Sequence, residues 1–196
     1  MIDPVARALP AADRAAVAWK NGGGVTREIA AAPPDADMAG FLWRVSIADV
    51  AADGPFSAFP GVDRTLTMIE GAGMELTVGA GGTLVDAPYV PQDLPGDVTT
   101  GCRLLGGPVV NLNVMWRRDA LPTPPAVAVV RGRLPLAPCT TLVVALTADG
   151  ASLPGLTLGR HDAALVAGAR TLHAPGPVAV VTGLPAAGTT APAGTR

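Results

Sequence analysis

The chain has 196 residues, a formal net charge of −2 and only 15% charged residues. This charge balance argues against a nucleic-acid-binding surface and against an acidic tail. Apolar residues make up 49% of the chain, which is enough for a buried core and argues against general disorder. The 24 glycines and 20 prolines are spread between short apolar runs, a pattern typical of many strands and turns.

The sequence also predicts where the protein resides. The N-terminal segment lacks the continuous apolar stretch of a signal peptide, and no run reaches the roughly 18 apolar residues that a membrane span needs. Cys102 and Cys139 do not form a Cys-x-x-Cys motif, so we expect both thiols to be reduced, buried and inert. We therefore expect a cytoplasmic protein with neither a nucleic acid nor a membrane as its partner.

Residues 19–28, Trp-Lys-Asn-Gly-Gly-Gly-Val-Thr-Arg-Glu, combine polar groups with backbone freedom. Three successive glycines cost roughly 0.5–1 kcal/mol each to order relative to alanine. They indicate either a tight turn before a strand or a point where another group approaches the backbone closely. Lys20 is the single lysine, whereas the other thirteen basic residues are arginine. A compact ammonium at this one point suggests a binding role.

Short apolar or alternating runs predict an all-β chain. Residues 42–49 and 109–117 alternate most clearly between an apolar and a polar face. We expect further strands over 26–31, 64–70, 74–78, 83–87, 97–105, 126–131, 140–147, 156–158, 163–166 and 178–182. We also expect a hairpin turn at 71–73 and turn-rich or proline-rich loops at 53–61 and 88–96.

A proline-rich linker over 121–125 divides the predicted chain. We expect an N-terminal barrel over 1–120 that carries the ligand site, a smaller barrel over 121–185, and a frayed tail over 186–196.

The polar faces of 42–49 and 109–117 carry Arg44 with Ser46, and Asn111 with Asn113. In an open sandwich these faces meet solvent, whereas in a small barrel they line a cavity that can hold one small ligand. Arg64, at the start of its strand, is a candidate for the same site. Guanidinium groups, amides, a hydroxyl and one ammonium suit a ligand that carries a carboxylate.

Other chemistry finds less support in the sequence. His161 and His173 are the only histidines and, even with Asp162, they do not form a ligand cluster, so we expect no metal and no cofactor. A Gly-x-Ser-x-Gly motif is absent, and we assign no catalytic residue. Glu28 or Glu70 could act as a general base if buried, so an enzyme stays open as an alternative.

Several segments together resemble the HutD/Ves family. They comprise residues 19–29, then Phe-Leu-Trp-Arg-Val-Ser-Ile-Ala at 41–48, 53–64 (Asp-Gly-Pro-Phe-Ser-Ala-Phe-Pro-Gly-Val-Asp-Arg), Pro-Gly-Asp at 95–97 and Asn-Leu-Asn-Val-Met at 111–115. The likeness covers roughly residues 5–118 in order and fades after the linker.

The resemblance implies a bicupin, with two β-barrels in one chain and without the histidine-rich metal motif of typical cupins. The family is associated with bacterial histidine utilisation, where its member is thought to restrain the pathway by binding a carboxylate such as urocanate or a formylated glutamate. A related branch is described as stress-induced. Family members often have Asp where this chain has Asn111, which would make the site here less acidic.

The sequence thus leads to a bicupin that senses or buffers a carboxylate metabolite of histidine catabolism as a regulator. The ligand-binding candidates are Lys20, Asn21, Glu28, Arg44, Ser46, Arg64 and Asn113. The alternative is a metal-independent cupin enzyme, an isomerase or lyase that acts on a small carboxylic acid with Glu28 or Lys20 as proton carrier. A structural or protein-partner module is a third option, and a homodimer stays open.

Overall fold

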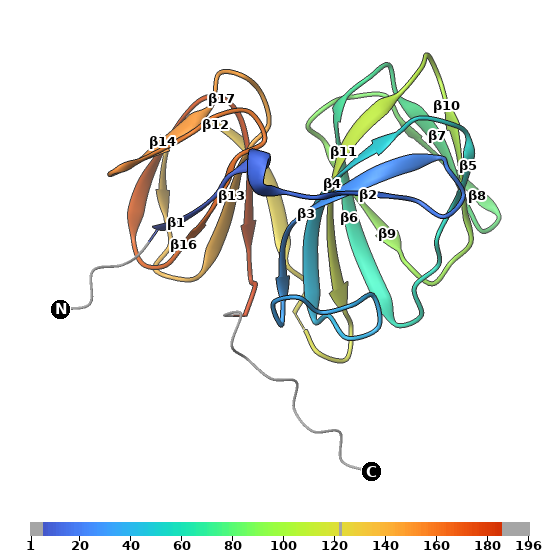
Figure 1. Ribbon diagram of the computed structural model, residues 1–196, viewed down its shortest axis with the longest axis horizontal. Coiled ribbons are helices and arrows are strands. Elements are labelled where there is room, and N and C mark those ends of the chain that lie inside the picture. Colours follow the sequence, from blue (N-terminus) through green and yellow to red (C-terminus); the bar gives the residue numbers. More distant parts are fainter. Residues whose placement is uncertain (1–5, 122, 186–196) are drawn as a thin grey trace, which may run out of the picture. The chain divides into compact units, whose positions relative to one another are not determined.

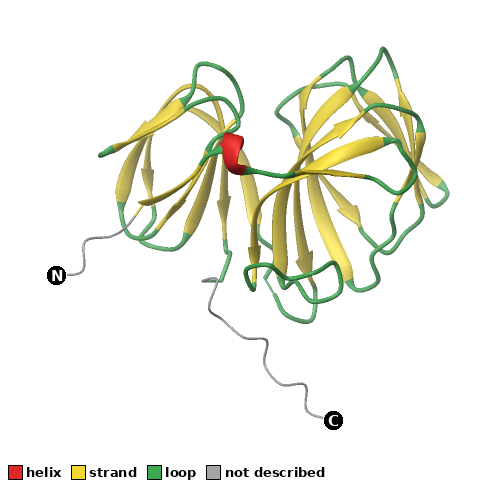
Figure 2. Ribbon diagram, in the orientation of Figure 1, coloured by secondary structure: helices red, strands yellow, loops and turns green. Residues whose placement is uncertain are grey.

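The computed structural model describes residues 6–121 and 123–185, so the predicted tail over 186–196 lies outside the described residues (Figure 1). The described part contains 17 strands and one 3-10 turn, Ala11–Asp13, and it contains no α-helix (Figure 2). The prediction of an all-β chain is therefore confirmed. Within these residues, no helix has the length and apolar character that crossing a membrane requires.

The described chain divides into two compact units, one of residues 15–121 and one of residues 6–14 with 123–185. The first unit contains two antiparallel sheets. The six-stranded sheet has the order β2 (Ala16–Ala18), β3 (Gly24–Ala32), β4 (Trp43–Val50), β11 (Val109–Arg117), β6 (Val62–Glu70) and β9 (Pro91–Pro95). The four-stranded sheet has the order β5 (Gly54–Phe56), β10 (Thr100–Leu104), β7 (Met74–Val78) and β8 (Gly81–Val85).

Both sheets of this unit contribute to one hydrophobic core. Its buried members are Val50, Leu66, Met68, Met74, Leu76, Val85, Leu94, Cys102 and Val109. Because these residues come from the two sheets, the sheets face one another and enclose a nearly closed barrel.

The second unit is a single seven-stranded sheet. Its order is β1 (Ala6–Leu9), β16 (Ala163–Val166), β13 (Thr141–Ala145), β17 (Arg170–Thr182), β14 (Ala151–Leu153) and β15 (Leu156–Leu158), with β12 (Ala126–Leu136) paired to β17. Small and branched apolar residues from β12 to β17 form its own core. The long strand β17 organises this sheet, since it pairs with β12, β13 and β14.

The first strand belongs to this second unit, although the sequence analysis assigned residues 1–120 to the N-terminal barrel. Strand β1 pairs with β16, from Ala6 opposite Val166 to Leu9 opposite Ala163. Arg14 reinforces the pairing, since its Nη1 donates to the carbonyl of His161 at 2.7 Å. These partners are about 150 positions apart in the sequence, so no local pattern could reveal the pairing.

Most predicted strands are present within a few residues of their expected bounds, and the run 109–117 coincides with β11. The predicted hairpin at 71–73 is wrong, because β6 and β7 belong to different sheets. The predicted loops at 53–61 and 88–96 contain β5 and β9. Strand β9 pairs only with β6, and an edge strand of this kind tolerates proline because one side needs no ladder hydrogen bonds.

The glycine segment forms the turn between β2 and β3. Gly22 has a φ of +72°, a conformation that glycine adopts without steric cost. A Cβ at Gly24 would lie 2.4 Å from the carbonyl oxygen of Asp49 and 3.1 Å from the Trp19 ring. Both interpretations of the segment are therefore partly correct. The segment forms a tight turn, and its backbone is approached closely by Asp49 and Trp19 of the same chain.

We expect Gly24→Ala to lower the free energy of unfolding of this unit by about 1–3 kcal/mol, because the new methyl group overpacks against a backbone oxygen. Urea denaturation followed by tryptophan fluorescence measures the effect, since Trp19, Trp43 and Trp116 all lie in this unit. Gly23→Ala is the control, because its Cβ would meet only the Asn21 side chain at an ordinary 3.4 Å. A loss as large in the control would contradict the steric explanation.

Candidate functional site

Two adjacent rows of cross-strand partners bring most of the predicted ligand residues together on one face of the six-stranded sheet. One row, in sheet order, is Glu28, Ser46, Asn113, Leu66 and Gln92. The next row is Ala31, Arg44, Met115, Arg64 and Leu94. Directly opposed residues of an antiparallel pair lie on the same face. We call these two rows the polar belt.

The polar belt faces the interior of the barrel. Leu66 and Leu94, which belong to the belt, are also members of the core between the two sheets. The inward orientation of the polar faces, one of the two alternatives that the sequence left open, is thus the one observed. Glu28, Arg44 and Asn113 are partly exposed even though they face inward from central strands. Solvent therefore reaches this part of the barrel interior.

Arg64 is the most deeply buried charge of the belt, with 6% of its surface exposed. Its Nε and Nη2 are buried and have no hydrogen-bond partner within the described residues. The guanidinium carbon lies 5.0 Å from the centroid of the Phe56 ring, in a cation–π contact. Burial lowers the pKa of Arg64 to about 10, so the group is still charged at neutral pH. Arg64 is thus a desolvated cation with unused donors.

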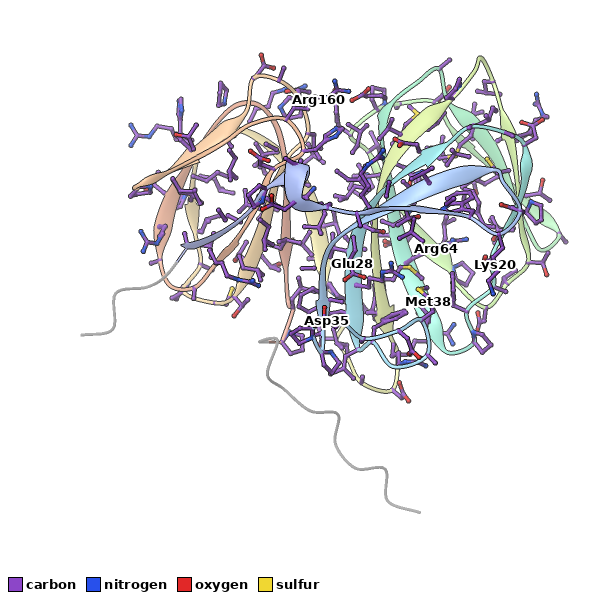
Figure 3. All side chains as sticks on the ribbon, viewed as in Figure 1. Lys20, Glu28, Asp35, Met38, Arg64 and Arg160 are labelled. Carbon is purple, nitrogen blue, oxygen red and sulfur yellow. The ribbon has the colours of Figure 1, made fainter. Side chains whose placement is uncertain are left out.

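Arg44 occupies a different electrostatic environment in the same row. Its Nε lies 2.7 Å from Oε2 of Glu28, as an ion contact whose angle does not make a hydrogen bond. Its Nη1 donates to the sulfur of Met38. A β-bulge after Glu28 shifts the register of β3 against β4 where the two charges meet. The charge of Arg44 is therefore balanced, whereas that of Arg64 is not; Glu28, Met38 and Arg64 are labelled in Figure 3.

Asn113 lies diagonally from both arginines, one strand over and one row along. Its Nδ2 donates to Oδ1 of Asn111 at 2.6 Å. Its own Oδ1 is buried and has no partner within the described residues. Ser46, 4% exposed, lies in register between Glu28 and Asn113. The belt therefore contains an unsatisfied acceptor close to the unsatisfied donors of Arg64.

Phe56, which contacts Arg64, packs in turn against a second aromatic side chain, Trp19. Trp19 and Phe56 pack edge to face, with ring centroids 6.2 Å apart. The Trp19 Nε1 donates to Oγ1 of Thr26 at 2.7 Å, which holds the indole against β3. Neither aromatic is among the ligand residues predicted from the sequence. The contact of Phe56 with a buried arginine is a long-range feature that spacing alone does not reveal.

Two predicted ligand residues lie outside the polar belt. Lys20 is exposed in the turn between β2 and β3, and Figure 3 labels it apart from Glu28 and Arg64. Asn21 lies in the same turn, where its Oδ1 accepts a hydrogen bond from the Gly23 amide at 3.1 Å. That contact gives Asn21 a local role in turn formation.

The remaining candidates for chemistry are dispersed. Within residues 6–121 and 123–185, no three His, Cys, Asp or Glu side chains are grouped so that they could hold a metal ion. Asp162 accepts hydrogen bonds from the amides of Ala11 and Gly159, at 2.7 and 2.9 Å, and so stabilises the second unit.

The two thiols differ in burial. Cys102 is buried, and desolvation, followed by the charge of Asp53, raises its pKa to about 11. Cys139 is exposed, so the prediction that both thiols are buried is wrong for this residue.

Comparison with known proteins identifies the family. The HutD family model matches residues 11–181. The chain belongs to the HutD family. The chain is 37% identical over 108 residues to an uncharacterised 21.2 kDa protein in the hutC 3′ region of Pseudomonas putida. It is 40% identical over 102 residues to protein Ves of Citrobacter koseri. These matches span 55% and 52% of the chain, and they cover only about half of each relative, 56% and 52%.

A solved structure supports the same assignment over a longer span. HutD from Pseudomonas fluorescens SBW25 is 32% identical, with a TM-score of 0.79, over 90% of this chain and 97% of that one. The chain therefore has the cupin-like β-barrel fold of its HutD relatives. The family is linked to histidine utilisation through the gene neighbourhood after which the P. putida relative is named.

Because Arg64 is buried without a counter-ion among the described residues, we expect Arg64→Met to raise the free energy of unfolding by at least about 1 kcal/mol. Removing the charge ends its desolvation penalty, and the thioether preserves volume and contact with Phe56. Urea denaturation followed by tryptophan fluorescence, without added anions, measures the change.

Arg118→Met is the matched control. Arg118 is exposed and pairs with Asp63 at 2.8 Å and with Asp97 at 2.7 Å, so its replacement should leave the free energy of unfolding almost unchanged. A destabilised Arg64→Met protein would show that the guanidinium supports the barrel and is not a strained binding group.

Proposed function

We propose that the barrel of residues 15–121 binds a small carboxylate, and that Arg64 provides the main contact with the anion. The observation that carries this proposal is that Arg64 is 94% buried and that its Nε and Nη2 lack partners among the described residues. Burying a charged group is unfavourable unless it is paired and hydrogen-bonded. A carboxylate supplies both the charge and two acceptor atoms in the geometry of the guanidinium.

The rest of the polar belt supports an anionic ligand. The two belt arginines, Arg44 and Arg64, and Glu28 together leave one excess positive charge on this inner face. Ser46 and Asn113 add groups that can orient a ligand by hydrogen bonds. The Trp19 and Phe56 rings offer apolar surface to the carbon skeleton of a small acid.

Family membership indicates which acids to consider. A relative named for the hutC region suggests that the acid belongs to histidine breakdown, such as urocanate or a formylated glutamate. We further propose that the chain is a bicupin whose two units are both cupin-like barrels, and that it acts in the cytoplasm as a sensor or buffer that regulates histidine utilisation. Two units with separate cores, and the 90% coverage by a HutD structure, support this arrangement.

The first test is calorimetry with urocanate, N-formyl-L-glutamate, histidine and formate. We expect at least one acid to bind, and Arg64→Met to weaken its binding about 10- to 100-fold, the range of a hydrogen bond to a charged group. Arg27→Met is the control, because Arg27 pairs with Asp49 on the outer face of the sheet and should not affect affinity. Absence of binding at millimolar concentrations, or equal binding by both variants, would refute the proposal.

The second test concerns Glu28. We expect Glu28→Gln to tighten binding of the same acid several-fold, because it removes the carboxylate that competes for Arg44. The gain should shrink in high salt, since it arises from a partly exposed charge. Weaker binding in Glu28→Gln would instead assign Glu28 a direct contact with the ligand.

Proton NMR of the same mixtures separates a sensor from an enzyme. A sensor leaves the spectrum of every acid unchanged over hours, apart from the effects of binding. New product signals that disappear in Arg64→Met would favour the isomerase or lyase alternative.

A further inference from the structure

We infer that the ligand of the polar belt carries an N–H or O–H donor in addition to its carboxylate, and that Oδ1 of Asn113 accepts a hydrogen bond from this donor. The inference rests on the proposed function, because it takes Arg64 as the anion contact. It adds a specificity-determining residue and narrows the ligand class from small acids to acids with a second, donating polar group.

The inference is based on two neighbouring side chains whose hydrogen-bonding groups are unsatisfied in opposite ways. In the part of the chain that the structure describes, two donors of Arg64 have no acceptor, whereas the buried carbonyl oxygen of Asn113 has no donor. In the register of β6 and β11, Arg64 pairs with Met115 and Leu66 pairs with Asn113, so the two polar residues are diagonal neighbours. Diagonal neighbours on one face are about 7–8 Å apart, a span that a small bifunctional molecule can bridge.

The amide of Asn113 has one bonded end and one free end. Its Nδ2 is fixed by the hydrogen bond to Asn111, a residue only 1% exposed, which leaves Oδ1 as the free end of the side chain. The residue as a whole is only half-buried. Rotation about the last side-chain bond of asparagine meets a broad energy well, so a small turn presents Oδ1 to a ligand. A donor placed there removes the penalty of an unsatisfied buried acceptor.

This arrangement predicts discrimination as well as affinity. A site built to hydrogen-bond a ligand N–H rejects an analogue that lacks it, because the buried acceptor is then left unpaired. When two analogues differ only by replacement of N–H with oxygen or a methylene group, their shapes are nearly the same, so shape contributes little to the difference in their affinities.

The experiment uses two matched pairs of acids on the full chain. Pyrrole-3-carboxylate is compared with furan-3-carboxylate, and 4-acetamidobutyrate with 6-oxoheptanoate, by calorimetry or competition. We expect the N–H member of at least one pair to bind 10-fold or more tightly than its partner. Asn113→Leu should bring the ratio to about one, whereas Thr67→Val should leave it unchanged. Thr67 is a matched control, since its buried hydroxyl also lacks a partner among the described residues but belongs to the opposite face of β6.

The outcomes separate this inference from the proposed function. If both members of each pair bind equally, and binding still depends on Arg64, the role of Asn113 is refuted while anion binding stands. If no acid binds, the proposed function fails and this inference fails with it. Should Asn113→Leu not fold, Asn113→Asp replaces it: the added charge should weaken both members, and the retained acceptor should preserve the preference for the N–H member.

Discussion

The main constraint on this barrel is the burial of one guanidinium, that of Arg64, next to the apolar core between the two sheets. Arg64 lies between Leu94 on one side and Met115 on the other, in a strand whose next inward residues are Leu66 and Met68. Folding therefore has to remove water from a permanent charge, and the surrounding core must supply the free energy to do so. Natural sequences keep such unfavourable groups where function needs them, because selection tolerates stability losses above a threshold.

The local pattern of the sequence predicts the strands well and their pairing poorly. The alternation in 42–49 and 109–117 correctly assigns Arg44 and Ser46 to one face and Trp43 and Val45 to the other, because side-chain direction depends only on a period of two. The hairpin at 71–73 fails because glycines specify a turn but not which sheet the returning strand joins. The assignment of residues 6–9 to the N-terminal barrel fails for a similar reason. These residues form β1, which pairs with β16 near the other end of the chain.

For the candidate site, too, the sequence predicts which residues take part better than it predicts their positions and surroundings. The polar alternation and the charges of the sequence predict Arg44, Arg64 and Asn113 as ligand residues, and the strand register brings the three together. Lys20 lies in an exposed turn outside the polar belt, so the structure does not bring it together with these residues, and its role in binding stays a prediction. The glycines beside it are explained by the packing of Trp19 and Asp49 against the backbone. What the sequence could not supply is the state of each charge, which depends on neighbours from four strands.

That difference in charge state assigns the two arginines different roles. Arg44 is already paired with Glu28 and partly solvated, so an incoming anion gains little from it unless the carboxylate moves away. Arg64 has paid its desolvation cost during folding, and an anion that reaches it meets a fixed cation in a medium of low effective dielectric. Preorganisation of this kind lowers the cost of binding, because the guanidinium does not need to lose its water again. A free Arg64 and a neutralised Arg44 therefore favour recognition of one carboxylate at a defined point, with the balanced pair as a second contact that the ligand must compete to use.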